Sequence, residues 1–355
     1  MTMASQDTMP ETRDKVPSEH SVLEIENASV AFAMERGDAR VLDNVSVNVR
    51  EGEVLGVVGE SGSGKSMLAD SMLDAVDSPG TLTGTIRFNP PEGGDPIVVN
   101  DLSKEELRRF RWERVSMVVQ GALDSFNPTL SIGDHFVETL RAHDYDVVEG
   151  MERARQLLSD VHLEPDRVLD SYPYELSGGM TQRALIALSL ILDPDVLVMD
   201  EPTAALDLLM QQSILKLLSE LKREYDLTIV IVTHDLSHVA RISDRLAVMY
   251  AFEILELGPV ENIVTDPAHP YTRELLNSIP DITADLDQMA SIEGTSPDPL
   301  NVPKGCSYHP RCPLADEQCV ETNPDLFEVS GEHSAACFYT DEARESIPLK
   351  KEVTE

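Results

Sequence analysis

The hydrophobic and polar positions of this chain alternate between short apolar runs and longer amphipathic segments. Three runs are apolar on consecutive positions and rich in valine and isoleucine: residues 54–58 (VLGVV), 195–200 (DVLVMD) and 227–233 (LTIVIVT). Such runs are typical of strands that are buried on both faces of a parallel sheet. Helical periodicity fills the intervals, over residues 64–75, 133–142, 149–161, 179–192 and 206–224. Strands that alternate with helices in this way predict an α/β domain with a parallel sheet.

Other segments depart from this alternation. The β-rich runs LEIENASVAF and VSVNV precede the first buried strand, and residues 121–180 lack strong strand runs, which indicates an inserted helical subdomain. After about residue 280 prolines accumulate and the periodicity fades. We therefore expect a disordered tail over 1–20, a main domain over 21–265 with its helical subdomain at about 121–180, a helix and proline-rich linker over 266–303, and a small module over 304–345.

The composition narrows the possible partners and compartment. The formal net charge is −36, and only eight of the 28 basic residues are lysine. Such a surface repels phosphate backbones, which makes nucleic acid a poor partner. It also resembles the surfaces of proteins from salt-loving organisms, so we expect the source to be a halophilic archaeon. The first 20 residues have no apolar stretch typical of a signal peptide, and the longest apolar run, ALIALSLIL, is too short to span a bilayer. We expect a soluble, cytoplasmic chain.

A phosphate-binding loop follows the first buried strand. The sequence GESGSGKS fits the pattern G-x-x-x-x-G-K-[ST] and opens a helix, as that pattern requires. Backbone N–H groups of such a loop surround phosphates, and the N-terminus of the helix adds the positive end of its dipole. We expect Lys65 to reach the β- and γ-phosphates and the Ser66 hydroxyl to ligate Mg²⁺. The expected nucleotide-binding residues of this loop are Gly59, Glu60, Ser61, Gly62, Ser63, Gly64, Lys65 and Ser66.

Two acidic residues end the second buried run. Asp200 lies at the carboxyl end of a predicted strand, where ligands of open α/β sheets bind, and we expect it to hold Mg²⁺ directly or through water. Glu201 follows and is placed to act as the general base for the attacking water.

Residues 175–207, ELSGGMTQRALIALSLILDPDVLVMDEPTAALD, resemble the nucleotide-binding subunits of ABC transporters, whose signature LSGGQ is read here as LSGGM. The resemblance implies a P-loop, RecA-like ATPase core with an antiparallel β subdomain, an inserted helical subdomain and a small C-terminal cysteine-containing domain. In that family two chains enclose ATP between them, so the donors at Ser177, Gly178 and Gly179 would meet the γ-phosphate held by the other chain.

Further residues match the family's motifs in order. Gln120 resembles the glutamine that senses Mg²⁺ and the attacking water, and Asp207 resembles the aspartate that links the two sites. His234, in IVTHDL, resembles the switch histidine at the γ-phosphate, and Phe32 resembles the aromatic residue that stacks on adenine. The resemblance implies Glu201, His234 and Gln120 as catalytic residues, with ATP and Mg²⁺ as ligands.

Several stretches narrow the resemblance to one branch of the family. QGALDSFNPTLSIGDHFVETL, YPYELSGGM, DPAHPYTRELLNSIP and the tail from VPKGCSYHPRCP to HSAAC are similar to the ATPase subunits of oligopeptide/dipeptide importers, a branch that includes nickel and some archaeal sugar importers. The implied partners are permease subunits, a second ATPase subunit (a related chain or a second copy) and, through the complex, an extracellular substrate-binding protein. The implied location is the cytoplasmic face of the membrane. One departure is Phe252-Glu253, which stands where the family usually has a glycine turn.

All four cysteines lie in the last 50 residues of the chain, at Cys306, Cys312, Cys319 and Cys337. Four thiolates suit a [4Fe–4S] cluster or a tetrahedral zinc ion, although the C-x₂-C pairs of zinc ribbons are missing. Because the importer branch includes C-terminal domains with a [4Fe–4S] cluster, we expect that cluster, with zinc or free or paired thiols as alternatives. His309 and His333 are possible zinc ligands, but we expect ordinary surface residues there.

Other classes of ABC protein fit the sequence less well. A soluble ABC ATPase of nucleic-acid maintenance would carry a long insertion between phosphate loop and signature, whereas Lys65 and Ser177 are only 112 positions apart (177 − 65). A metal-binding regulator with a degenerate ATPase site would lack catalytic residues, whereas Glu201 and His234 are both present. The same ATPase role in a sugar or nickel importer remains the alternative for the cargo.

Overall fold

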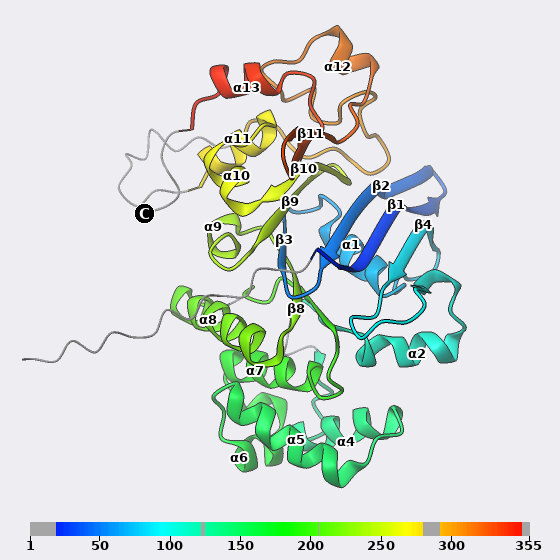
Figure 1. Cartoon of the computed structure of the whole chain (residues 1–355), viewed down its shortest axis with the longest axis vertical. Coiled ribbons are helices and arrows are strands. Elements are labelled where there is room, and N and C mark those ends of the chain that lie inside the picture. Colours follow the sequence, from blue (N-terminus) through cyan, green and yellow to red (C-terminus); the bar gives the residue numbers. More distant parts are fainter. Residues whose placement is uncertain (1–18, 122–124, 205, 280–291, 350–355) are drawn as a thin grey trace, which may run out of the picture.

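A computed structural model describes residues 19–121, 125–204, 206–279 and 292–349 of the chain (Figure 1). Residues 1–18 of the predicted disordered tail lie outside the described residues, as do residues 280–291 of the predicted helix and proline-rich linker.

The central sheet of the described residues has eight strands in the order β11-β12-β10-β9-β3-β8-β7-β6. Five neighbours, β9-β3-β8-β7-β6, run parallel, and β10, β12 and β11 add an antiparallel edge. The parallel strands are β3 (Val54–Val58), β6 (Val115–Val118), β7 (Val196–Asp200), β8 (Thr228–Thr233) and β9 (Arg245–Tyr250). The three strands predicted from apolar runs are therefore confirmed, and they lie next to one another.

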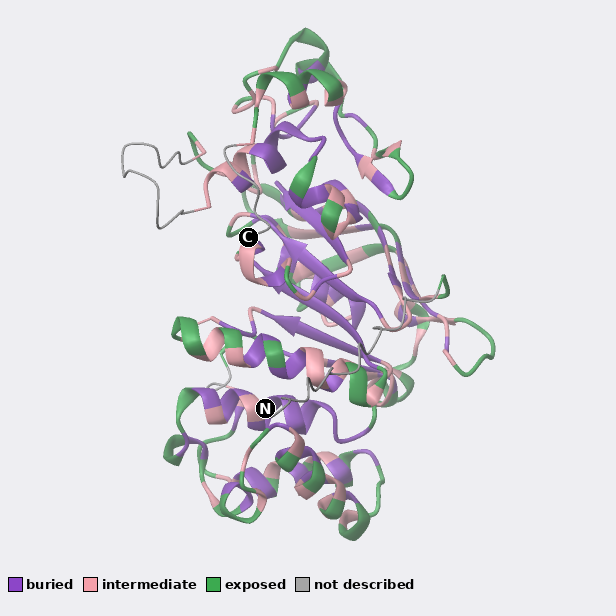
Figure 2. Ribbon diagram, turned by 60° about the vertical axis from the view of Figure 1, so that its left-hand side comes forward, coloured by how far each residue is buried: buried purple, intermediate pink, exposed green. Residues whose placement is uncertain are grey.

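These strands are buried on both faces, which explains why they read as continuous apolar runs. Alternate side chains enter two separate cores: Leu197 and Ile229 enter one, and Val198 and Val230 enter the other. The first core is shared with the helical subdomain and the C-terminal region, and the second lies between the central sheet and a smaller sheet. Figure 2 shows the result as buried strands through the middle of the molecule.

The smaller sheet is antiparallel, with strand order β2-β1-β4-β5. It consists of β1 (Ser21–Met34), β2 (Gly37–Arg50), β4 (Gly80–Phe88) and β5 (Ile97–Val98), followed by the 3₁₀ turn η1 (Val99–Asp101) and α2 (Lys104–Glu113). The first two strands were anticipated by the sequence, and β4 was not.

The helical subdomain lies at the lower end of the view in Figure 1. It contains α4 (Ile132–Ala142), α5 (Val147–Asp160), α6 (Pro165–Asp170), the turn η2 (Pro173–Glu175) and α7 (Gly178–Ser189). Side chains cap the N-termini of α4, α5, α6 and α7, with Ser131, Asp146, Glu164 and Ser177 as the capping residues, which explains why these helices begin where they do. Other described helices of the main domain are α1 (Lys65–Met72), α8 (Leu208–Tyr225) and α9 (Leu236–Val239).

The C-terminal region is joined to the central sheet. After β10 (Glu253–Pro259), α10 (Val260–Thr265) and α11 (Pro270–Asn277), the chain forms α12 (Glu317–Glu321), β11 (Phe327–Ser330), β12 (His333–Ala335) and α13 (Thr340–Ser346). Strand β12 pairs with β10 through Glu256↔Ala335 and Leu257↔Ser334. Residues 327–335 therefore extend the sheet that carries the phosphate loop, although the domain boundaries proposed from the sequence stay predictions.

Among the described residues, no helix combines the length and the apolar character that a membrane crossing requires.

Candidate functional site

The phosphate loop connects β3 to α1 and is shaped by its glycines. Gly59 has a φ of 154°, and a Cβ atom there would lie 2.1 Å from the Met249 carbonyl oxygen. Gly64 has a φ of 100°, and a Cβ atom there would lie 2.7 Å from the Val41 carbonyl oxygen. Only glycine meets both demands, because it tolerates positive φ and occupies no space beyond its backbone. The loop is thereby held tightly against its neighbours on β9 and β2.

Lys65 is folded back over the loop. Its ammonium group donates to the carbonyl oxygens of Gly59 at 2.9 Å and Glu60 at 2.8 Å, and the residue is only 6% exposed. Burial lowers the pKa of Lys65, and the negative charges of Glu201 and Asp200 oppose that effect. A buried ammonium whose partners are carbonyl and hydroxyl oxygens of its own loop is available to bind a phosphate there.

The two predicted magnesium ligands lie together. The pKa of Asp200 is raised because of its burial, although a hydrogen bond with the Ser66 hydroxyl opposes the shift. The other carboxylate oxygen, Oδ1, is buried and has no hydrogen-bond partner among the described residues. Such an orphaned carboxylate oxygen beside a hydroxyl fits Mg²⁺, which prefers hard oxygen ligands.

Glu201 and His234 form a contact. Glu201 Oε1 lies 2.8 Å from His234 Nδ1 and accepts from the His234 backbone N–H at 3.1 Å, while the Thr233 hydroxyl donates to Oε2 at 3.3 Å. Glu201 has a φ of 49°, in the left-handed region, and its N–H donates to the Val232 carbonyl of β8. This backbone conformation turns the side chain toward the end of β8, where the histidine begins the next loop. The His234 side chain is 64% exposed and remains free to meet a ligand.

The other predicted residues of this chain's own site are more dispersed. Gln120 is exposed just after β6, next to residues 122–124, which lie outside the described residues. Phe32 lies on β1, half-buried, with its ring beside Gly80 of β4. Asp207 caps α8 by accepting from the Met210 N–H at 3.0 Å. Within the described part of the chain, no hydrogen bond joins these three residues to the phosphate loop, so their roles stay predictions.

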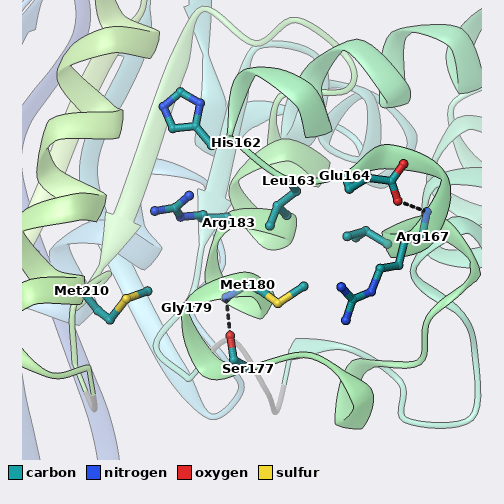
Figure 3. Close-up of a pocket in the computed structure, with 10 residues that line it drawn as sticks. His162, Leu163, Glu164, Arg167, Ser177, Gly179, Met180, Arg183 and Met210 are labelled. Atoms are coloured by element: carbon teal, nitrogen blue, oxygen red, sulfur yellow. Dashed lines mark hydrogen bonds between the residues drawn. The ribbon is translucent and has the colours of Figure 1, made fainter.

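The signature motif begins α7. Ser177 accepts from the Met180 N–H at 3.4 Å, and Ser177 and Gly178 are both exposed. Figure 3 shows this turn at one side of a cavity of about 310 Å³ that is also lined by Arg183, Met210 and the start of α6. In the described part of the chain, the hydrogen bonds of Ser177 stay within its own helix. The structure therefore does not bring the signature to the phosphate loop of the same chain.

Glu60 has a contact that the sequence does not signal. Its N–H donates to the hydroxyl of Tyr271, on α11, at 3.0 Å. No local pattern could reveal this contact, because 211 positions separate the two residues.

Comparison with known proteins shows which family shares these motifs. Residues 42–204 match the family described as ABC transporter, and residues 255–319 match the oligopeptide/dipeptide transporter C-terminal region. A dipeptide transport ATP-binding protein of Caldanaerobacter subterraneus is 40% identical over 332 residues, which cover 93% of this chain and 99% of that protein. An oligopeptide transport ATP-binding protein of Salmonella typhimurium is 38% identical and covers 93% of this chain and 98% of its own.

The chain belongs to this family of ABC transporter ATP-binding proteins. Solved structures agree: a dimeric bacterial ABC transporter cassette matches with a TM-score of 0.58 and 29% identity over 67% of this chain and 98% of that chain. The same figures hold for a post-hydrolysis state of that cassette bound to ADP and phosphate. The predicted fold, an ABC cassette with an antiparallel β subdomain and a helical subdomain, is confirmed, and the ABC family assignment makes the chain an ATPase.

The predicted metal centre of this ABC ATPase is wrong. Cys306, Cys312, Cys319 and Cys337 line one cavity, but among the described residues no group of three or more histidine, cysteine or acidic side chains could hold a metal ion. The matched relatives are ordinary ABC ATPases, so neither the [4Fe–4S] cluster nor zinc is supported. Burial raises the pKa of Cys306 to about 11 and that of Cys337 to about 12. All four are free thiols.

The two nearby histidines also differ from expectation. His333 is fully buried, with Nε2 2.6 Å from Glu256 Oε1, so it belongs to the β12–β10 contact instead of the surface. His309 is half-buried and its Nδ1 lies 2.9 Å from the Cys306 carbonyl oxygen. Both histidines thus form local contacts within the C-terminal region and the β10 strand, which the sequence alone does not indicate.

Proposed function

We propose that this chain is the ATPase subunit that energises an importer of oligopeptides or dipeptides. The observation that supports the proposal best is the match of residues 255–319 to the oligopeptide/dipeptide transporter C-terminal region, together with full-length similarity to dipeptide and oligopeptide transport proteins. The sugar and nickel importers considered above have no such observation in their favour.

The catalytic roles follow from the contacts at the ends of β3, β7 and β8. The loop from Gly59 to Ser66 would bind the phosphates of ATP, with Lys65 moving from its own loop's carbonyls to the β- and γ-phosphates. Ser66, Asp200 and Gln120 would hold Mg²⁺, which neutralises phosphate charge when it is bound.

Glu201 is proposed as the general base. Its Oε1 is held by His234, and its Oε2 accepts only a long hydrogen bond from Thr233. A carboxylate oxygen would take a proton from water as the water oxygen bonds to the γ-phosphorus and the bond to the bridging oxygen of ADP breaks. The products are ADP and inorganic phosphate. His234 orients the carboxylate and, with its exposed ring, can also reach the γ-phosphate.

A second ATPase chain would complete each site. The N–H groups at Ser177, Gly178 and Gly179 would bind the γ-phosphate on the other chain, Asp207 would link the two sites, and Phe32 would stack on adenine. The matched bacterial cassette is dimeric, which supports this arrangement. The partner can be a related subunit or a second copy.

The remaining partners are permease chains, which would dock on the helical subdomain at the cytoplasmic face of the membrane, and an extracellular substrate-binding protein. We further infer adaptation to high salt, from the net charge of −36. Weak screening at low salt leaves that charge self-repelling. The melting temperature should therefore rise from 0.2 M to 3 M KCl, and a flat or falling response would contradict the inference.

The decisive experiment uses the complex with its permeases in proteoliposomes. Glu201→Gln should bind ATP with affinity within about twofold of wild type and lose at least about 99% of turnover, because the base is removed while the phosphate contacts remain. The matched control is Glu224→Gln, an exposed carboxylate on α8.

Two readouts separate the two parts of the proposal. Undiminished hydrolysis by Glu201→Gln would overturn the assignment of the base. Peptide-dependent stimulation of ATPase activity and peptide uptake would support the cargo class, whereas stimulation only by a sugar or a nickel chelate would overturn that class and leave the ATPase assignment intact.

A further inference from the structure

The second residue of the phosphate loop forms an ion pair with the C-terminal region. Arg311 Nη1 donates to Glu60 Oε2 at 2.9 Å, and Arg311 Nη2 donates to Glu60 Oε1 at 3.0 Å. Both oxygens of the carboxylate are therefore bound by the two arms of one guanidinium, the geometry in which an arginine–carboxylate pair is strongest and most directional. The Arg311 side chain is 7% exposed, so the pair is screened little by solvent.

The orientation of Arg311 is fixed by its surroundings. Its Nε donates to the Glu293 carbonyl at 2.7 Å, and its guanidinium lies 5.5 Å from the Tyr250 ring centre and 5.9 Å from that of Tyr308. Tyr250 ends β9, whereas Tyr308 belongs to the cysteine-containing segment. A guanidinium held by aromatic faces and a backbone carbonyl has lost its rotamer freedom before it meets Glu60.

Three residues that follow β10 in the sequence form hydrogen bonds with Glu60. Besides Arg311, the Ser296 hydroxyl donates to its Oε2 at 2.5 Å, and Tyr271 accepts from its N–H. Its carbonyl oxygen is one of the two that bind the Lys65 ammonium. The position of Glu60 therefore sets the position of the group that must reach the phosphates.

The ion pair between Arg311 and Glu60 also affects the charge that the phosphate loop presents to a nucleotide. A bare carboxylate at this point of the loop would repel the phosphates of an incoming nucleotide, and Arg311 neutralises it. Removing the arginine alone would leave a half-buried negative charge without its cationic partner, which is more harmful than removing both partners.

We propose that Arg311 is a positioning residue of the ATPase, and that through Glu60 the C-terminal region holds the phosphate loop in its nucleotide-binding geometry. The nucleotide site is thus incomplete without a residue that stands next to Cys312, 251 positions after the loop. This inference concerns ATP binding and does not depend on the cargo.

The test compares Arg311→Ala, Arg311→Lys, Glu60→Gln and the double variant Arg311→Ala/Glu60→Gln in the full-length chain. Binding of Mg·ATP is followed by calorimetry, and KM and kcat are measured in the complex with the permeases. The matched control is Arg344→Ala, an arginine of the same C-terminal region whose carboxylate partners are the surface residues Asp266 and Asp341.

We expect Arg311→Ala to raise the Kd and KM for ATP at least tenfold, with a smaller change in kcat. Arg311→Lys keeps the positive charge but cannot bind both carboxylate oxygens of Glu60 with two N–H arms, so it should raise the Kd and KM about threefold. Glu60→Gln should have an effect below threefold, and adding it to Arg311→Ala should recover part of the lost affinity. Arg344→Ala should leave Kd within twofold of wild type.

Two results would overturn the proposal. One is an Arg311→Ala variant that melts at a lower temperature but binds ATP within twofold of wild type, since that is the behaviour of a purely structural contact. The other is a double variant whose loss equals the product of the single losses. If Arg311→Ala does not fold, Arg311→Lys and Glu60→Gln decide: unchanged ATP affinity in Arg311→Lys contradicts the proposal.

A reciprocal readout uses amide hydrogen exchange. Coupling between two sites is mutual, so Mg·ATP should slow exchange of the backbone around residues 306–312 in wild type. That protection should be lost in Arg311→Lys and kept in Arg344→Ala. Equal protection in all three proteins would show that nucleotide binding does not pass through Arg311.

Discussion

The N-termini of α1 and α7 are both glycine-rich turns that offer N–H groups to phosphate, but they differ in what surrounds them. At α1, Gly64 takes a left-handed conformation, no side chain caps the helix, and Lys65 binds the loop's own carbonyls. At α7, Ser177 caps the helix in the ordinary way and is exposed. The first turn is completed by residues of its own chain, whereas the second presents its donors to solvent. A helix end that, as we propose, meets a phosphate held by another chain would need an ordinary cap, because it must be stable before that ligand arrives.

The strongest way to break this comparison is to remove the lysine of the first turn. Lys65→Ala should weaken Mg·ATP binding by about 100-fold or more, about 2.8 kcal/mol, because the loop loses its only ammonium and leaves Asp200 and Glu201 facing the phosphates. Calorimetry on the isolated chain measures this directly. Lys216→Ala, an exposed lysine on α8, is the control, and equal binding by both variants would contradict the assignment.

The second turn should respond differently. Gly178→Asp adds a side chain where the nearest atom outside the motif is 3.8 Å away, so the fold should tolerate it. The new carboxylate would oppose the γ-phosphate of the other chain, so turnover should fall about 100-fold, about 2.7 kcal/mol in the barrier. ATP affinity of the isolated chain should stay within twofold. A loss of affinity in the isolated chain would show that the signature acts within its own chain.

Stability should separate the two turns as well. Gly64→Ala forces a side chain into positive φ and against the Val41 carbonyl and Phe252, which should cost about 3 kcal/mol. Ser177→Ala removes only a cap, which should cost about 1 kcal/mol. Thermal melting should therefore show a drop for Gly64→Ala at least twice that for Ser177→Ala. Equal drops would mean that the phosphate loop is no more tightly held than the signature.

The smallest expected effect concerns pH at the first turn. Burial raises the pKa of Asp70, on α1, to about 6, with a further contribution from the charge of Asp200. A raised carboxyl pKa means that the folded chain holds a proton that the unfolded chain releases, so stability is lost as pH rises from about 4 to about 6. Asp70→Asn should melt about 1–3 °C above wild type at pH 8 and together with it at pH 4. A difference that is the same at both pH values would contradict the assignment.

Local patterns predicted the parts of the molecule that depend on neighbouring residues. The runs that became β3, β7 and β8 are apolar on consecutive positions because both faces are buried, and helices such as α4 and α5 were placed within two residues of their ends. Glu201 and His234 were both chosen from motifs, and the structure adds that they touch.

Long-range pairing could not be predicted from such patterns. The antiparallel strand β4 and the β9–β10 hairpin were not foreseen, and the hairpin turns through Ala251 and Phe252 at positive φ where a glycine is usual. Phe252 keeps this conformation because its N–H donates to the Ser63 carbonyl and its carbonyl accepts from the Asp43 N–H. The pair Arg311–Glu60 and the burial of Cys306, Cys319 and Cys337 likewise depend on contacts between segments that are far apart in the sequence. The number and spacing of the cysteines therefore led to the wrong prediction of a metal centre.

The pairing of β12 with β10 has a consequence for how the protein is made. During translation, β9 and β10 leave the ribosome well before residues 333–335, so the nascent ATPase carries an open sheet edge until its last segment is released. An unpaired edge is a site where chains associate wrongly. The arginine that holds Glu60 emerges late as well, so a nascent or truncated chain should be assembled around its parallel strands before it can bind nucleotide firmly.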